Sequence, residues 1–295
     1  MKSDKNILIA FLLNLVFCLF ELIGGAITGS VAIVSDAVHD FGDSLSIGIS
    51  YFLEKLSKKA PDENYTYGYK RFSVIASTIT TVILLSGSIV MIYNSVLRLI
   101  NPIKINHNGM LIFAIIGTVV NLVAAIVTHR GHSMNEKSVS LHMLEDVLGW
   151  IVVLIGAIII KFTGFVMIDP LLSLVVALFI LICSIKNIKE ILSIYLEKTP
   201  KGLTVQGVKN KLCKISGVEG VHHIHLWSID GEENLATMHI VTNGDTDKIK
   251  KEVKSILLDL GINHSTIETE KLGEACGDKQ CNTSEHSHTH HHHHH

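Results

Sequence analysis

Six stretches of the chain are apolar over a length that fits a lipid bilayer. The hydrocarbon core of a bilayer is about 30 Å thick, and a helix needs roughly 20 apolar residues to cross it. The hydrophobic pattern therefore predicts transmembrane helices at residues 7–29, 31–53, 72–97, 109–127, 139–160 and 165–185. We expect residues 1–185 to form a six-helix transmembrane domain.

The pattern changes after residue 185, where apolar positions fall into short periodic segments. We expect a linker at 186–201 and a small domain at 202–271. Within that domain the spacing predicts helices at 204–215 and 246–260, and strands at 220–229, 235–241 and 262–270. Asp230 and Gly231 are typical of a hairpin turn. The order α-β-β-α-β indicates an α+β domain, followed by a flexible tail at 272–289 and a purification tag at 290–295.

The composition agrees with a membrane protein. Of the 295 residues, 48% are hydrophobic and only 18% are charged, which is unusually apolar for a soluble protein of this size. The net charge of −2 gives no indication of a nucleic-acid partner. The 5 cysteines are scattered and predict no disulfide framework. No nucleophile–base pair or phosphate-binding loop is evident, so an enzyme is not expected.

The distribution of Lys and Arg predicts the orientation of the spans. Cytoplasmic loops carry an excess of positive residues, and one side of the predicted bundle holds most of them. The other side holds only Arg98, Lys104 and Lys161. Both termini are therefore expected in the cytoplasm. The rich side comprises Lys2, Lys5, Lys55, Lys58, Lys59, Lys70, Arg71, Arg130, Lys137, Lys186, Lys189, Lys198 and Lys201.

Two copies of one short pattern lie inside predicted spans: His39-x-x-x-Asp43 and His142-x-x-x-Asp146. Residues four apart lie on one face of a helix, so each copy presents an imidazole beside a carboxylate. Ionisable residues at bilayer depth are costly and indicate function. Two His and two Asp have the number and type of ligands that suit one tetrahedral Zn²⁺. Contact between helices is the alternative, although such contacts usually use Ser, Thr, Asn or Gln.

Other polar residues share these spans and have less defined roles. Asp36 and Asp40 lie within a sector of roughly 100° with the first pair, which favours an entry path or structural hydrogen bonds. Glu145 is expected to support the second pair rather than bind metal. Glu21 fits either a helix contact or a vestibule. Asn14 and Asn121 are candidates for hydrogen bonds to the ligands.

Six short motifs follow one another along nearly the whole chain. They are Ser35-Asp36-Ala37-Val38-His39-x-x-x-Asp43, Tyr65-Thr66-Tyr67-Gly68-Tyr69-Lys70-Arg71, His142-x-x-x-Asp146, Asp169-Pro170, Glu197-x-x-Pro200 and Val221-His222-x-x-His225-Leu226-Trp227. By these motifs and their order, the chain resembles the cation diffusion facilitator family of divalent-metal/proton antiporters.

This resemblance implies a homodimer with six spans per protomer and a cytoplasmic ferredoxin-like domain. It also implies alternating access around a tetrahedral site on the second and fifth spans. By this carry-over His39, Asp43, His142 and Asp146 are the transport ligands. His at the first place of both pairs is similar to zinc-preferring members. Asp there widens the choice toward cadmium, and Asn suggests manganese or iron.

The chain departs from the family pattern in the loop after the second span. Tyr65 and Tyr69 stand where some relatives have metal-binding His, so we expect no zinc in this loop. The family's basic-x-acidic motif ends here in Ser73 rather than an acid. Arg71 is still a candidate to pair with Glu197, with a surface ion pair of no consequence as the alternative.

The C-terminal domain concentrates histidine and carboxylate groups on its predicted strands. His222 and His239 lie on the two strands of the hairpin and are expected to meet across it. The resemblance favours these two with Glu270 as one zinc-binding set. Cys276 and Cys281 are candidates for a second site shared with the other protomer, or else belong to a disordered, reduced tail. Weaker candidates are His223, His225, His264 and Glu268.

These features predict a transporter that exports Zn²⁺ in exchange for H⁺, with Zn²⁺ also a structural or regulatory ligand. Protons and metal compete for the same carboxylates and imidazoles, which gives antiport a chemical basis. The alternatives are a transporter of manganese, iron or cadmium, and a non-transporting membrane sensor or partner subunit. A channel is less expected because four ligands hold an ion too tightly for fast conduction. The connection at His129 and His132 lacks a long His-rich insert, which favours a prokaryotic plasma membrane.

Overall fold

The computed structural model describes residues 3–28, 31–101, 110–129, 133–164 and 167–274. The chain divides into two compact units, Met1–Tyr195 and Leu196–His295. Each unit has its own buried core.

The first unit consists of long helices. The prediction of a helical membrane region is confirmed. Within the described residues, α1, α3, α5 and α6 are long and apolar enough to cross a bilayer, and α4 contributes the shorter apolar stretch Ile115–His129. The helices are α1 (Ser3–Thr28), α2 (Val31–Ser57), α3 (Arg71–Ile100), α4 (Met110–His129), α5 (Met134–Thr163) and α6 (Ile168–Tyr195).

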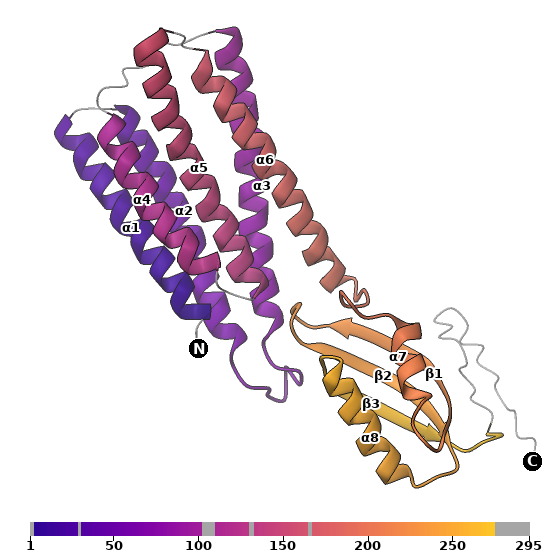
Figure 1. Cartoon of the computed structure of the whole chain (residues 1–295). Helices are drawn as coiled ribbons and strands as arrows, with labels where there is room; N and C mark the ends of the chain where they lie inside the picture. The colour runs from indigo at the N-terminus through magenta and orange to yellow at the C-terminus, as the bar shows by residue number, and fades with distance from the viewer. Residues whose placement is uncertain (1–2, 29–30, 102–109, 130–132, 165–166, 275–295) are drawn as a thin grey trace, which may run out of the picture. The chain divides into compact units, whose positions relative to one another are not determined.

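The helices pack side by side with a polar interior and an apolar outer surface. The most extensive contacts join α1 to α2, α4 to α5 and α3 to α6 (Figure 1). Large apolar side chains such as Val16, Phe52 and Val119 are more than half exposed, whereas Ser50 and Thr80 are fully buried. This distribution is the reverse of that in a soluble protein. It is the arrangement that a lipid environment requires, since lipid is as apolar as leucine.

A close contact at Gly117 fixes the packing of α1, α4 and α5. The rings of Phe17 and Trp150 meet edge to face with centroids 5.7 Å apart. A Cβ atom at Gly117 would lie only 2.7 Å from Trp150 Cε2 and 2.8 Å from Phe17 Cζ. A glycine at this position therefore lets two aromatic rings pack directly against the α4 backbone.

The last helix of the unit differs from the expectation. α6 continues to Tyr195, through the first part of the segment 186–201 that we expected to be a linker. The reason is helical spacing, because Ile188, Ile191 and Ile194 recur every third residue and pack against Val74 of α3. Exposed charged residues in this last part of α6 lower its mean hydropathy, so hydropathy alone does not reveal the apolar stripe.

The second unit is an α+β domain with the predicted element order. The sheet order is β1-β2-β3, with β1 and β2 antiparallel and β2 and β3 parallel. Thr204 caps the first helix by accepting from Gly207 N, and Asp245 caps the second. Its elements are α7 (Val205–Leu212), β1 (Val218–Ser228), β2 (Asn234–Thr242), α8 (Thr246–Asp259) and β3 (Ile262–Glu270).

The two faces of this sheet carry different chemistry. Side chains alternate between faces along a strand, and Ala236, Met238 and Ile240 of β2 join the buried core with residues of α7 and α8. Figure 1 shows both helices against the sheet. His239 lies between two of these core positions and therefore points to the opposite face. The turn between β1 and β2 is the predicted hairpin, in which Asp230 Oδ1 accepts from Glu232 N and Glu233 N.

Candidate functional site

The structure brings three of the four predicted transport ligands together between α2 and α5. Ligand atoms of Asp43, His142 and Asp146 all lie within 4.8 Å of one another. His142 Nε2 is 3.5 Å from Asp43 Oδ1, and both side chains are buried. Two carboxylates and an imidazole converging in an interior of this kind form a donor set that suits a divalent cation.

The fourth predicted ligand, His39, lies on the same helix as Asp43. α2 is continuous from Val31 to Ser57, so residue 39 is one turn before residue 43. The side chains of His39 and Asp36 are outside the described residues. Their role in the site therefore stays a prediction.

Three further candidates from the sequence, Asn14, Asn121 and Glu145, have described side chains. Asn14 Nδ2 of α1 donates to the backbone oxygen of Asp40 at 3.5 Å. Glu145 points toward α3, where a Cβ atom on Gly87 would lie 3.9 Å from Glu145 Oε1. Asn121 is buried, and within the described part of the chain its amide makes no hydrogen bond.

The site holds more acid than a neutral metal complex needs. Glu21 is buried in α1, and together with Asp40 and Glu145 it lies close enough to Asp146 to repel the carboxylate of that residue. Negative charges that share a low-dielectric interior repel one another strongly. The group is therefore chemically suited to take up cations, whether metal ions or protons.

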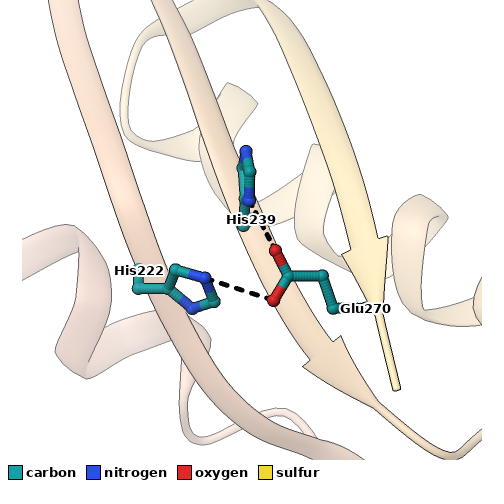
Figure 2. A group of neighbouring side chains, drawn as sticks. All are labelled: His222, His239 and Glu270. Atoms are coloured by element: carbon teal, nitrogen blue, oxygen red, sulfur yellow. Dashed lines mark hydrogen bonds and ion pairs between the residues drawn. The ribbon is translucent and has the colours of Figure 1, made fainter. Parts of the chain in front are cut away.

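A second cluster lies on the open face of the sheet in the C-terminal unit. Glu270 stands between two histidines, with Glu270 Oε2 3.2 Å from His222 Nε2 and Glu270 Oε1 2.6 Å from His239 Nδ1 (Figure 2). Their ligand atoms lie within 4.8 Å of one another. Two imidazoles and a carboxylate are three of the ligands that a zinc ion takes, with a fourth position left for water or another group.

The strand register explains how these residues meet. His222 pairs directly with His239 across β1 and β2, and Glu270 pairs with Val241, diagonal to His239. An irregularity in β1 follows His222, where His223 has a positive φ of 51°. Non-glycine residues rarely adopt this conformation. It brings the His223 ring onto that of His239, with centroids 4.8 Å apart.

The weaker histidine candidates fall into two groups. His223, His225 and Glu268 border the cluster, and Glu268 Oε2 is 3.4 Å from His239 Nε2. Desolvation, and then repulsion by His223 and His239, lower the pKa of His225. His264 is exposed and pairs with Leu235 near the start of β3, away from the cluster.

The loop between α2 and α3, which contains Tyr65 and Tyr69, holds a compact polar contact. Asp62 Oδ2 accepts from Tyr69 Oη at 2.6 Å and from Lys59 Nζ at 3.1 Å. These bonds, together with backbone donors, lower the pKa of Asp62 well below its usual range. The ring of Tyr65 lies 4.4 Å from that of Tyr69, between centroids. The expectation of no zinc here stays a prediction.

Two further predictions lie beyond what the structure describes. Cys276 and Cys281 are outside the described residues. Arg71 and Glu197 are described, but they belong to different units. Their pairing therefore stays a prediction.

Sequence reasoning missed two buried carboxylates at the end of the bundle where α2 ends and α5 begins. Glu54 is 3% exposed and accepts from Ser73 Oγ and Asn135 Nδ2. Glu136 is 2% exposed and accepts from Asn6 Nδ2 and from Ser133 N. The second had a readable signal, since Ser133-x-x-Glu136 is a capping box. The first left no such signal in the sequence of α2.

Comparisons with known proteins match both units. The model of the cation efflux transmembrane domain matches residues 7–196, and that of the cation efflux protein cytoplasmic domain matches residues 200–271. The cadmium, cobalt and zinc/H(+)-K(+) antiporter of Bacillus subtilis (strain 168) is 33% identical over 277 residues, which covers 91% of this chain and 89% of that protein. The zinc transporter ZitB of Yersinia pestis is 33% identical over 287 residues, covering 95% and 91%. ZitB of Escherichia coli (strain K12) is 29% identical over 291 residues, covering 96% and 92%.

Proposed function

This chain belongs to the cation diffusion facilitator family, and from that premise we propose that it exports Zn²⁺ from the cytoplasm in exchange for H⁺. The chain is an integral membrane protein of metal-cation efflux and not an enzyme.

One observation carries the proposal. Asp43 of α2 and His142 and Asp146 of α5 converge in the interior of the bundle. We propose that His39 completes a tetrahedral set, because it lies one helical turn before Asp43. Two carboxylates neutralise the charge of Zn²⁺, and two neutral imidazoles supply nitrogen ligands that zinc favours.

The same groups supply the coupling to protons. When the metal leaves, the carboxylates and their acidic neighbours repel one another, and proton uptake relieves that repulsion. Histidine titrates near neutral pH, so protonation of His39 or His142 removes the lone pair that binds metal. Protons entering from outside would displace zinc, and cytosolic zinc would displace protons.

The test is zinc flux in reconstituted vesicles, measured with an internal zinc indicator at several imposed pH gradients. We expect zinc entry to rise when the lumen is more acidic than the outside, and the lumen to become more alkaline as zinc enters and protons leave. Flux that ignores the gradient would rule out the coupling. Asp43→Ala and His142→Ala should each abolish flux without loss of the folded protein, and His264→Ala is the matched control.

We further propose that the chain works as a homodimer whose His222, His239 and Glu270 cluster binds zinc. The support is the donor set itself and its place on an open sheet face. Zinc bound there would favour one arrangement of the domains and so link cytosolic zinc to transport. Mass measurement in detergent with and without zinc tests the dimer. Zinc analysis after removal of residues 290–295 tests the cluster.

Metals other than zinc are alternative candidates for the transported ion. A relative's name includes cadmium and cobalt besides zinc. Two imidazole ligands favour zinc, but cadmium also accepts nitrogen and carboxylate ligands. Competition of Cd²⁺, Co²⁺ and Mn²⁺ against Zn²⁺ in the flux assay decides the selectivity. The excess of positive residues on one side favours both termini in the cytoplasm, and the short connection at His129 and His132 favours a prokaryotic plasma membrane. Opposite accessibility of the tag would reverse the orientation.

A further inference from the structure

A set of buried polar side chains connects the candidate transport site to the end of the bundle where α2 ends and α3 and α5 begin. Each member is at most 5% exposed, although the bundle surface is apolar. We call this set the polar column. It consists of Ser46, Ser50 and Glu54 of α2, Ser73, Ser77, Thr80 and Thr81 of α3, Asn135 and Ser138 of α5, and Asn187 of α6.

The spacing of these residues continues the faces that carry the transport ligands. On α2, Ser46, Ser50 and Glu54 follow Asp43 at intervals of three and four residues. Residues at these intervals share one face of a helix. Glu54 lies about three turns beyond Asp43, or roughly 16 Å along the axis. The polar column thus extends from the site toward one membrane face.

Hydrogen bonds between helices close the column. Ser50 Oγ of α2 is 2.8 Å from Thr80 Oγ1 of α3, and Ser77 Oγ of α3 is 2.5 Å from Ser138 Oγ of α5. Asn187 Nδ2 of α6 donates to Ser138 Oγ at 2.8 Å. These neutral bonds are individually weak relative to a bond that involves a charge.

Glu54 is the member of the column that carries a carboxylate. Its Oε2 accepts from Ser73 Oγ at 2.7 Å and from Asn135 Nδ2 at 3.2 Å, so one oxygen joins α2, α3 and α5. Asn135 Nδ2 also donates to the backbone oxygen of Ser50 at 3.0 Å. Separating a buried carboxylate from its hydrogen-bond donors costs much free energy, unless water or a cation takes the place of the donors.

On the premise that a cation passes through the site between α2 and α5, we propose that Glu54 is a positioning residue that holds the polar column closed on its side of the site. The column opens when Ser73 and Asn135 separate from the carboxylate. Water and an arriving cation can then take the place of the two donors. Opening of the polar column at this end therefore depends on the entry of water or a cation that can replace the two donors to Glu54.

The contact between Ser73 and Glu54 lies where the family resemblance implies an acidic residue in place of Ser73. The basic-x-acidic motif after the second span ends in Ser73 instead of an acid. In the structure Ser73 donates to a carboxylate from the neighbouring helix. The acid is therefore present at this level of the bundle, but α2 supplies it. This arrangement makes an exchange of the two residues a direct test.

The experiment measures how fast a thiol in the column reacts. A Ser46→Cys reporter is placed in full-length protein whose native cysteines are replaced by serine, reconstituted in vesicles. Ser46 is buried and, among the described residues, its hydroxyl makes no hydrogen bond. A membrane-impermeant methanethiosulfonate reagent is added without metal. With Glu54 present we expect slow labelling. Glu54→Ala should accelerate labelling at least about tenfold, as expected for loss of bonds to a charged group.

Three further variants separate positioning from general destabilisation. Ser73→Ala removes one donor and should accelerate labelling by a smaller factor, which keeps the test valid if Glu54→Ala folds poorly. The exchange Glu54→Ser with Ser73→Glu should restore slow labelling. Glu136→Ala is the matched control, since Glu136 is equally buried but bonds to Asn6 and Ser133. It should leave the rate unchanged.

Two results would overturn the proposal. One is a labelling rate in Glu54→Ala and Ser73→Ala within about twofold of the parent reporter. The other is equal acceleration by Glu136→Ala, which would indicate loosening of the whole bundle. The labelling assay does not depend on transport. A labelling result that contradicts the role of Glu54 therefore does not contradict zinc export. Loss of flux in Asp43→Ala, by contrast, concerns the proposed function alone.

Discussion

Zinc should stabilise the C-terminal domain against heat, and the size of the effect follows from the structure. The domain has its own hydrophobic core, formed by α7, α8 and all three strands, so a fragment covering residues 200–274 is expected to fold. This fragment lacks Cys276, Cys281 and the tag. Any zinc effect must then come from the cluster on the sheet or from another group within these residues.

The expected shift can be worked from the domain's size. A ligand at 100 times its Kd stabilises the folded state by about 2.7 kcal/mol. For a domain of 60–100 residues, each kcal/mol moves the melting temperature by roughly 4–8 °C. Zinc at that concentration should therefore raise the melting temperature by about 10–20 °C. Circular dichroism at several zinc concentrations measures the shift.

Two variants make this prediction specific. His239→Ala removes the imidazole that contacts Glu270 at 2.6 Å and should eliminate most of the shift. His264→Ala changes an exposed histidine of the same sheet that lies away from the cluster, and this variant should retain the shift. A full shift in His239→Ala, or its loss in His264→Ala, would refute the assignment of zinc to this cluster.

The remaining predictions concern packing, pH and the loop. Gly117→Ala should destabilise the bundle by roughly 1–3 kcal/mol in detergent melts because its Cβ overlaps two rings; Gly149→Ala, with nothing within 4 Å, should be neutral, and equal melts would contradict the packing account. Because the folded domain lowers the pKa of His225, protonation favours the unfolded state, so metal-free stability should fall as pH drops below about 6.5, the ordinary pKa. His225→Gln should flatten that decline in pH-dependent melts, and an unchanged slope would argue against it. Asp62→Asn should speed proteolysis of the loop between α2 and α3, because Asp62 accepts from Tyr69 and Lys59; unchanged digestion would show that other contacts hold the loop.

Much of the architecture was predictable because it follows from periodicity. The strand bounds at 262–270 and the helix start at 246 agree with the structure, since Gly261 separates the last helix from the last strand and Asp245 caps the start of that helix. The meeting of His222 and His239 was also predictable, because a short hairpin turn sets the register of its strands. The positive φ of His223 was not, since an irregularity in a strand leaves no signal in the residue types around it.

The hydrogen bonds of Glu54 to Ser73 and Asn135 show why part of the bundle could not be predicted. A hydropathy reading ends a span at the first charged residue, and the predicted second span stopped at residue 53. The structure continues α2 to Ser57 and buries Glu54 against Ser73 and Asn135. Whether a carboxylate near a helix end faces water or a neighbouring helix depends on the positions of α3 and α5. The sequence of α2 alone does not contain that information.

The central claim is that one ion is held jointly by the two helices that carry the His and Asp pairs. The most direct measurement is a zinc-loaded structure in lipid, with the metal located by its anomalous scattering. The account predicts a single zinc ion between α2 and α5, about 2.0–2.2 Å from a nitrogen of His39, a nitrogen of His142 and an oxygen each of Asp43 and Asp146. Zinc absent from this position, or bound by only one of the two helices, would contradict it.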